Sequence, residues 1–394
     1  MKKIIILYIF TFLTGFATNL SHPVTPLYIT QLGVEPYMFG LFFAAMNTGM
    51  FIMSPIWGNL GDIRRRKFIV LIAFIGYGIA QAGFAYFSNP FHILAVRFMA
   101  GFFSCAISTS LLAYIIEDSD FKNKSRIISV HLALTMLGGS LAYLIGGFIG
   151  SKVDAPNLVI YMQAIVSFFM AALALLLDTK HKKNTGEKRS LLGQFSQIKH
   201  LSAPLIFLII TMIIVNLAQV NFSRYIDLYV TNLGYLSSDI GNFVFTTGII
   251  TILVTLFLVP VILRKFNKIW ILIIMNLVGA VVTFITFSLN TGQIFIWLYS
   301  IYTIYVVTRA FYDPALVEHL SEYKDVSHGM LMGMRQSALS LGAIIGPVLA
   351  GIIYGYVGVY LFYILSLLLG VSVVMFIIYK RWRRVDEAKR IHST

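Results

Sequence analysis

Acidic side chains inside long apolar runs are the most chemically informative residues of this sequence. Asp227 follows Arg224 by three positions and Asp313 follows Arg309 by four, so each acid shares a helix face with a base. An ionised group inside a bilayer costs about 3 kcal/mol or more, so such groups face a cavity or each other. Competition of a proton, an arginine and a substrate for one carboxylate would couple proton movement to transport. We expect Asp227 and Asp313 to do this; the alternative is that each acid is a permanent ion-pair partner that holds helices together.

Polar and aromatic side chains recur at helical spacing beside these acids. Aromatic rings attract cations, and a few polar groups in an apolar pocket suit varied drugs. The alternative for the tyrosines is a role in packing or at the membrane interface. His22, in the first apolar run, is a further candidate for proton transfer, or else a polar packing residue. The expected substrate-cavity residues are Asn19, Asn216, Gln219, Ser223, Tyr302, Tyr305 and Tyr312.

The elements that must position these residues are membrane-spanning helices. Of the 394 residues, 58% are hydrophobic and 12% are charged, whereas soluble domains carry about 25% charged residues. Apolar runs of about 20 residues cross a bilayer as helices, and the alternating segments of a membrane barrel are absent. The sequence therefore predicts an all-α membrane protein with twelve transmembrane helices. The predicted spans are 4–30, 38–60, 68–88, 91–116, 127–150, 157–177, 203–231, 238–263, 269–289, 292–317, 329–355 and 358–379.

The distribution of Lys and Arg predicts the orientation in the membrane. Of the 30 such residues, 25 fall in alternate loops and at both ends, and one, Lys152, falls in the other set of loops. The remaining four, Arg97, Arg224, Arg309 and Arg335, lie inside spans. By the positive-inside rule, both termini are expected on the cytoplasmic side of the inner membrane. The net charge of +14 therefore indicates a lipid bilayer as the partner, and not nucleic acid.

A polar, basic break and an internal repeat divide the chain into halves. The predicted parts are a six-helix bundle at 1–177, a central cytoplasmic loop at 178–200, a second six-helix bundle at 201–380 and a cytoplasmic tail at 381–394. The sequence LYITQLG ending at Gly33 matches LYVTNLG at an offset of 201, and three single-residue matches share that offset. Parallel six-helix pseudo-repeats predict a substrate site between the halves near the bilayer midplane, with alternating access.

Several motifs then resemble those of a known family. Segment 58–67, Gly-x-Leu-Gly-Asp-x-x-x-Arg-Lys, is a short basic turn that resembles the loop between helices 2 and 3 of the major facilitator superfamily. Segment 97–101, Arg-x-x-x-Gly, resembles its helix 4 arginine motif. Segment 342–351, Gly-x-x-x-Gly-Pro-x-x-Ala-Gly, resembles its antiporter motif. Segments 26–28 and 54–58 add similarity to the bacterial multidrug:proton antiporter branch. The resemblance covers the whole chain and implies the major facilitator fold.

The resemblance also implies roles for the charged residues. Helices 1, 4, 7 and 10 of the family line the transport cavity. This would bring four residues into one outer-half cluster: His22, Arg97, Arg224 and Asp227. From their depth in spans 10 and 11, and not from the resemblance, Arg309, Asp313 and Arg335 are expected to form an inner-half cluster. The expected proton-coupling residues are Asp227, Asp313, Arg97, Arg224, Arg309 and His22.

By the same resemblance, the basic turn forms a conformational latch. Arg66 is expected to pair with Glu117 or Asp118, and Asp62 to lie at the N-terminus of span 11, where an acid is favoured; Gly58 completes the latch. The alternative is a basic loop that only sets orientation. Glycines allow close helix approach, and the expected packing residues are Gly138, Gly146, Gly147, Gly342, Gly346, Pro347 and Gly351.

These patterns predict a secondary active transporter, foremost a proton-coupled exporter of amphiphilic or cationic drugs. The alternatives are a transporter of one solute (a siderophore, sugar or metabolite, by export or symport), a lipid flippase or a membrane sensor without transport. No phosphate-binding loop appears, and one cysteine, Cys105, excludes a disulfide framework or a cysteine-based metal site. We expect no enzyme activity, no metal and no cofactor, the proton gradient being the energy source, and a monomer.

Overall fold

The computed structural model describes residues 2–63, 66–117, 124–177, 202–323 and 328–393. Within these ranges every regular element is a helix, and twelve helical stretches are long and apolar enough to cross a membrane. The predicted all-α fold with twelve spans is therefore confirmed.

The helices fall into the order that the apolar runs predict, with breaks inside three spans. Those of the first half are α1 (Lys2–Asn19), η1 (His22–Val24), α2 (Thr25–Gln31), α3 (Pro36–Ile63), α4 (Arg66–Tyr86), α5 (Pro90–Glu117), α6 (Lys124–Gly150) and α7 (Asn157–Ala174). Those of the second half are α9 (Ala203–Asn232), α10 (Ser237–Leu253), η4 (Val254–Leu258), α11 (Val259–Lys265), α12 (Lys268–Ser288), η5 (Thr291–Gln293), α13 (Ile294–Tyr299), α14 (Ile301–Ser321), α15 (His328–Val357) and α16 (Tyr360–Ser393).

Prolines account for two of the breaks. In the first span, Pro23 and Pro26 cannot donate a backbone hydrogen bond, and the chain passes through the tight turn η1 between α1 and α2. In the eighth span, Pro260 follows the wider helical turn η4, a geometry that relieves the clash of a proline ring with the preceding turn. His22 thus lies at a helix break.

The basic turn predicted at 58–67 is mostly helical. Helix α3 continues through Asp62 to Ile63, and α4 begins at Arg66, so that only residues 64–65 fall outside the described chain. The prediction of a turn over the whole segment was therefore wrong, because the helical hydrogen bonds of α3 continue past the last apolar residues.

Two glycines give the internal repeat a structural counterpart. Gly33 and Gly234, 201 positions apart, have φ values of +64° and +86° and end α2 and α9. In both, the glycine N–H donates to a threonine carbonyl three residues earlier, at 3.1 and 2.9 Å. Such left-handed helix ends favour glycine because it has no Cβ.

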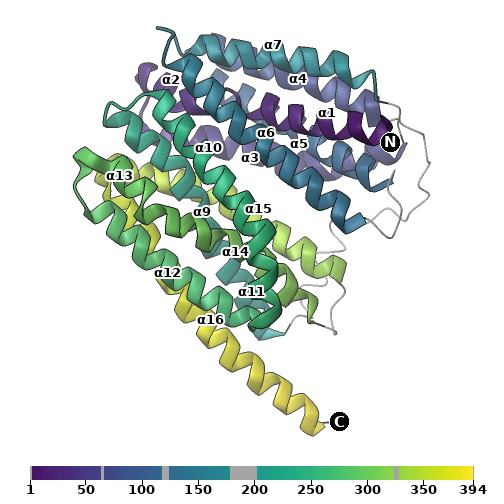
Figure 1. Cartoon of the computed structure of the whole chain (residues 1–394), viewed down its shortest axis with the longest axis vertical. Coiled ribbons are helices and arrows are strands. Elements are labelled where there is room, and N and C mark those ends of the chain that lie inside the picture. Colours follow the sequence, from purple (N-terminus) through teal and green to yellow (C-terminus); the bar gives the residue numbers. More distant parts are fainter. Residues whose placement is uncertain (1, 64–65, 118–123, 178–201, 324–327, 394) are drawn as a thin grey trace. The chain divides into compact units, whose positions relative to one another are not determined.

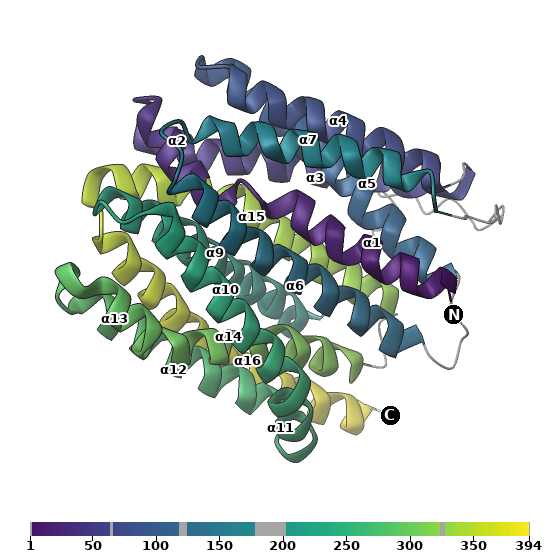
Figure 2. The same cartoon turned by 45° about the horizontal axis from the view of Figure 1, so that its top comes forward.

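Close contacts divide the chain into two compact units. The first unit comprises Met1–Lys188 and Asp227–Ile252, and the second comprises Arg189–Ile226 and Leu253–Thr394. Helix α10 thus packs with the first unit, and the division into a six-helix bundle at 1–177 and another at 201–380 stays a prediction. In the first unit α1 runs along α6 and α4 along α7; in the second, α12 packs against α14 and α16 (Figures 1 and 2).

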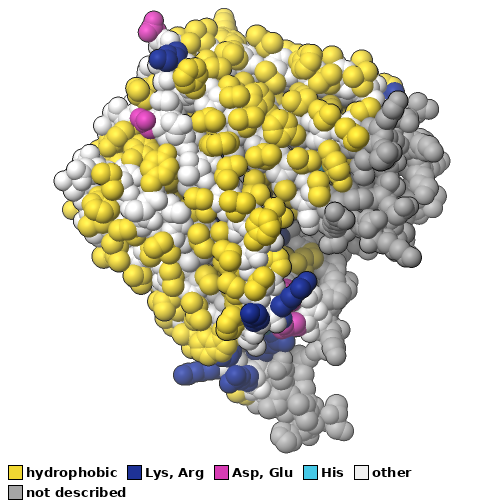
Figure 3. Space-filling view, viewed as in Figure 1, with side chains coloured by type: hydrophobic (Ala, Val, Ile, Leu, Met, Phe, Trp, Pro, Cys, Tyr) yellow, Lys and Arg dark blue, Asp and Glu magenta, His cyan; other side chains and the backbone are white. Residues whose placement is uncertain are grey.

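Each unit has an aromatic core. Phe74 and Tyr77 of α4 are fully buried in the first unit. In the second, Phe287 stacks on Phe362 with ring centroids 3.8 Å apart, and Phe222 stacks beside them. Outside these cores, the described part of the face shown in Figure 3 is largely hydrophobic, as expected for helices that face lipid.

Candidate functional site

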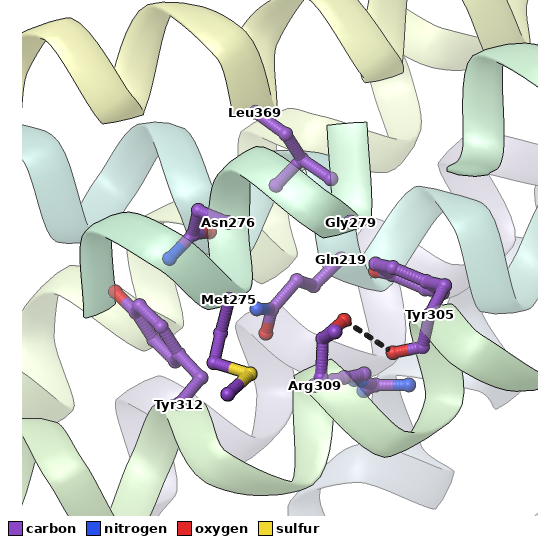
Figure 4. Close-up of a pocket in the computed structure, with 9 residues that line it drawn as sticks. Gln219, Met275, Asn276, Gly279, Tyr305, Arg309, Tyr312 and Leu369 are labelled. Atoms are coloured by element: carbon purple, nitrogen blue, oxygen red, sulfur yellow. Dashed lines mark hydrogen bonds between the residues drawn. The ribbon is translucent and has the colours of Figure 1, made fainter. Parts of the chain in front are cut away.

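Helix α14 presents a face of tyrosine and arginine to a small pocket in the second unit. Tyr305, Arg309 and Tyr312 are spaced by four and three residues, which places them on one helix face. The pocket lies among α9, α12, α14 and α16, with Gln219 at its centre (Figure 4). Its lining residues are Gln219, Met275, Asn276, Gly279, Tyr305, Thr308, Arg309, Tyr312 and Leu369. Sequence reasoning had proposed four of these nine.

Two hydroxyls in this pocket lack partners. Tyr305 and Tyr312 are 2% and 3% exposed, and neither hydroxyl has a hydrogen-bond partner among the described residues. By contrast, Thr308 donates to the Tyr305 carbonyl at 2.8 Å, which is the dashed line in Figure 4. A buried polar group without a partner costs about 1–3 kcal/mol, so two in one pocket suggest a site that exchanges hydrogen bonds with a ligand.

The charged residues of α14 have partners on two other helices. Arg309 donates from Nη1 to the Ser223 hydroxyl of α9 at 2.8 Å. Asp313, whose side chain is 59% exposed, accepts a hydrogen bond and ion pair from Arg335 of α15. Although Arg309 and Asp313 share a helix face, each is engaged elsewhere. The sequence placed Arg309, Asp313 and Arg335 in one inner-half cluster, and the structure pairs Asp313 with Arg335. Arg335 was not among the expected proton-coupling residues.

Two predicted cavity residues have packing roles in the second unit. Asn216 donates from Nδ2 to the Leu339 carbonyl at 2.5 Å and so joins α9 to α15. Tyr302 lies in an aromatic cluster, with ring centroids 5.0 Å from Tyr305 and 6.4 Å from Phe222. Neither residue lines the pocket.

Three other predicted residues lie in the first unit. Arg97 is buried against the rings of Phe43 and Phe84, with centroid distances of 5.6 and 4.8 Å. His22 stacks on Tyr143 at 5.7 Å. Asn19 donates to the carbonyl of its own helix four residues earlier, at 2.8 Å.

The remaining pair of charged residues lies on α9. Asp227 is 7% exposed and begins the part of α9 that belongs to the first unit. Arg224, half-buried, lies one turn earlier in the second unit. Their predicted pairing stays a prediction.

Glycines allow helix backbones to touch in both units. A Cβ at Gly138 or Gly146 of α6 would lie 2.0 or 1.9 Å from a backbone oxygen of the first span, and one at Gly147 would lie 2.4 Å from the Ser237 oxygen of α10. In α15, a Cβ at Gly342 or Gly346 would lie 2.7 or 2.9 Å from an asparagine amide of α9. The obstacles met by α6 are backbone atoms and leave no room for a side chain, whereas those met by α15 are the ends of side chains.

The rest of the glycine-proline motif also meets α9. The Pro347 carbonyl accepts a hydrogen bond from the Tyr225 hydroxyl at 2.8 Å, and Gly351, one turn later, is buried. This hydrogen bond joins α9 to α15 at the proline.

The predicted latch lies mostly outside the described side chains. Gly58 and Asp62 belong to α3 and Glu117 ends α5, but only their backbones are described. Asp118 falls outside the described residues, and Arg66 is buried at the start of α4. The latch therefore stays a prediction.

Among described residues, no three His, Cys, Asp or Glu side chains gather as metal ligands would.

Comparisons with known proteins agree with this architecture. The family model described as Major Facilitator Superfamily matches residues 7–324 and 236–394. Multidrug resistance protein 1 of Bacillus subtilis is 22% identical over 371 residues, 94% of each chain. Quinolone resistance protein NorA of Staphylococcus aureus is 24% identical over 360 residues, 90% of each chain.

Solved structures show the same fold. The nucleoside transporter NupG superposes with a TM-score of 0.76 at 16% identity, over 97% of this chain and 99% of that one. The xylose transporter XylE from E. coli gives 0.73 at 14% identity, over 95% and 94%. With its twelve spans and a family match over nearly its whole length, this multi-pass membrane protein belongs to the Major Facilitator Superfamily, a family of transporters.

Proposed function

We propose that this transporter exports amphiphilic or cationic drugs in exchange for protons, by alternating access. The observation that carries the proposal is the charged face of α14, where Asp313 pairs with Arg335 and Arg309 bonds to Ser223. The names of the two bacterial relatives, a multidrug resistance and a quinolone resistance protein, support the choice of cargo.

The Asp313–Arg335 pair offers a simple coupling step. A proton that binds the exposed carboxylate neutralises it and weakens the ion pair with Arg335. Helices α14 and α15 then lose one of the contacts that join them, which favours a second conformation. A ligand or proton shifts such an equilibrium only by its different affinity for the two states, and a carboxylate whose partner changes provides that difference. We assign the second acid of the coupling to Asp227, buried on α9.

The pocket supports binding of aromatic or cationic groups. The faces of Tyr305 and Tyr312 can attract a cation, while their unpartnered hydroxyls and the amide of Gln219 can hydrogen-bond to a polar substituent. The pocket is smaller than the usual site for a drug-sized molecule, so we propose that it holds one substituent of the cargo.

Transport into inside-out vesicles tests the proposal. We expect a cationic dye to accumulate when a proton gradient is imposed, and a protonophore to abolish the accumulation. In the Asp313→Asn and Asp227→Asn variants, dye transport should no longer be accompanied by a pH change. Asp239→Asn is the matched control, because this acid caps α10 through the Leu236 N–H at 2.9 Å and lies outside the proposed site. Full coupling in both of the first two variants would refute the proposal.

A specific solute is the second candidate. The unpartnered hydroxyls and amides of the pocket favour a polar, hydrogen-bonding molecule as much as a drug, and the structural relatives are named as nucleoside and xylose transporters. If no cationic dye is moved by wild-type vesicles while a polar solute is, this second function replaces the first.

We further propose that both termini are cytoplasmic, that the proton gradient alone drives transport, and that the chain works as a monomer. The excess of Lys and Arg in alternate loops supports the orientation. Labelling of Lys152→Cys by a membrane-impermeant thiol reagent added to intact cells would test the orientation, since residue 152 is expected outside.

A further inference from the structure

The second unit carries a surplus of positive charge at the ends of three spans. Five cations, here called the basic end, lie where spans 8 and 12 finish and span 9 begins. Lys and Arg side chains gather there at the lower edge of Figure 3, below a largely hydrophobic surface. The basic end consists of Arg264, Lys265, Lys380, Arg381 and Arg384.

The described acids nearby already have cationic partners. Lys268 Nζ lies 3.2 Å from Glu318 Oε1, and Arg383 Nη1 lies 3.8 Å from Glu322 Oε2. His319 Nδ1 also lies 3.2 Å from Glu322. Two acids thus occupy two cations, and none of the five residues of the basic end has a salt bridge to a described carboxylate. Among the described side chains no further acid neutralises the basic end, which leaves it open to an external anion.

One of these cations is positioned by an aromatic ring. Lys380 Nζ lies 3.5 Å from the centroid of Trp270, whose side chain is 48% exposed. Tryptophan favours the membrane–water interface, at the level of the lipid headgroups. Arg384 follows Lys380 by four residues on α16, so both can reach the same ligand.

An apolar stripe continues from this point toward the middle of the membrane. On α12 the exposed residues Trp270, Ile274, Leu277 and Val281 follow one another at helical spacing. Helix α16 packs against α12 and exposes Val374 in the same way. A row of cations at the end of an apolar stripe matches a molecule with an anionic head and hydrocarbon tails.

We propose that the basic end binds an anionic phospholipid, with the phosphate held by Lys380 and Arg384 beside Trp270 and an acyl chain along the exposed stripe of α12. A soluble acidic partner would use the charge but not the stripe, and a zwitterionic lipid would use the stripe but not the surplus charge. The site lies apart from the pocket and ion pairs of the proposed transport mechanism.

Lipid retention tests this assignment. The purified full chain is exchanged into micelles with equal phosphatidylglycerol and phosphatidylcholine, and bound lipid is counted by native mass spectrometry. We expect wild type to retain phosphatidylglycerol preferentially, and K380Q/R384Q to lose affinity by about fivefold for each cation removed. Lys380→Arg keeps the charge and should keep the lipid.

Lys152→Gln is the matched control, because Lys152 also lies over an exposed ring, 5.9 Å from the Phe148 centroid, in the first unit. It should retain phosphatidylglycerol as wild type does. Equal retention of both lipids by wild type, or undiminished preference in K380Q/R384Q, would overturn the proposal. So would an equal loss in Lys152→Gln, since total charge would then explain the binding. If the double variant does not fold, wild type is measured at high salt instead. We expect high salt to remove the preference for phosphatidylglycerol, and a preference that persists would overturn the proposal.

Discussion

Replacing Gly146 by alanine should destabilise the first unit through a single added methyl group. The new Cβ would lie 1.9 Å from the Leu20 carbonyl oxygen, whereas carbon and oxygen ordinarily approach to about 3.3 Å. The obstacle is backbone, which cannot rotate away as a side chain would. The first span must therefore move from α6 by more than an ångström, or the helices must lose other contacts.

The magnitude follows from two opposing effects. Overpacking in a close-packed interior costs about 1–3 kcal/mol, while replacing glycine in a helix recovers about 0.5–1 kcal/mol. Gly370 on α16 supplies the control, because a Cβ there meets nothing within 4 Å. Gly370→Ala should therefore keep only the gain, and the two variants should differ by about 2 kcal/mol.

The assay is reversible unfolding of both variants in the same detergent, followed by circular dichroism and repeated for Gly138→Ala, whose Cβ would lie 2.0 Å from the Phe12 oxygen. Gly138→Ala should follow Gly146→Ala. Equal free energies of unfolding for Gly146→Ala and Gly370→Ala would show that the approach of the helices does not limit stability, and the reasoning would fail.

Three other expectations follow from described contacts. Asp313→Ala and Arg335→Ala should each lower stability, and a double-mutant cycle should give a coupling of about 1 kcal/mol, because this ion pair is only partly exposed; additive effects would contradict the pairing. Tyr225→Phe should cost about 1 kcal/mol by removing the hydrogen bond to α15, measured by the same unfolding, and a neutral result would count against that contact. The hydrogen bond from His319 holds the pKa of Glu322 below its usual value, with nearby cations adding to the effect. The stability that ionised Glu322 contributes is therefore present above about pH 4.3, and it is lost as the pH falls through the lowered pKa. Glu322→Gln should flatten that acid limb of a stability–pH curve, and an unchanged limb would refute the assignment.

Much of the fold was predictable because it depends on local properties of the chain. Apolar runs of sufficient length specify spans whatever their neighbours are, and the repeat at an offset of 201 reappears as two helix ends with left-handed glycines. The segment 58–67 shows the limit of such reasoning. Its charges suggested a turn, yet backbone hydrogen bonding carries α3 through to Ile63.

The candidate site was less predictable because contacts between helices depend on which faces meet. Tyr305, Arg309 and Tyr312 were chosen from spacing along one helix, and that spacing does put them on one pocket. Tyr302 has the same spacing, but it does not line the pocket, and its ring contacts Phe222, Phe287 and Tyr305. A helical period identifies a face and not what lies opposite it.

The sequence by itself therefore determined the membrane-spanning class, the number of spans and the set of charges that the spans contain, because these follow from the free energy of placing side chains in a bilayer. Tertiary structure alone decided the partners. Asp313 pairs with Arg335, 22 positions away, and not with Arg309 on its own helix, which bonds to Ser223. Partner choice depends on which helices lie within hydrogen-bond reach, and only the packing of whole helices decides that.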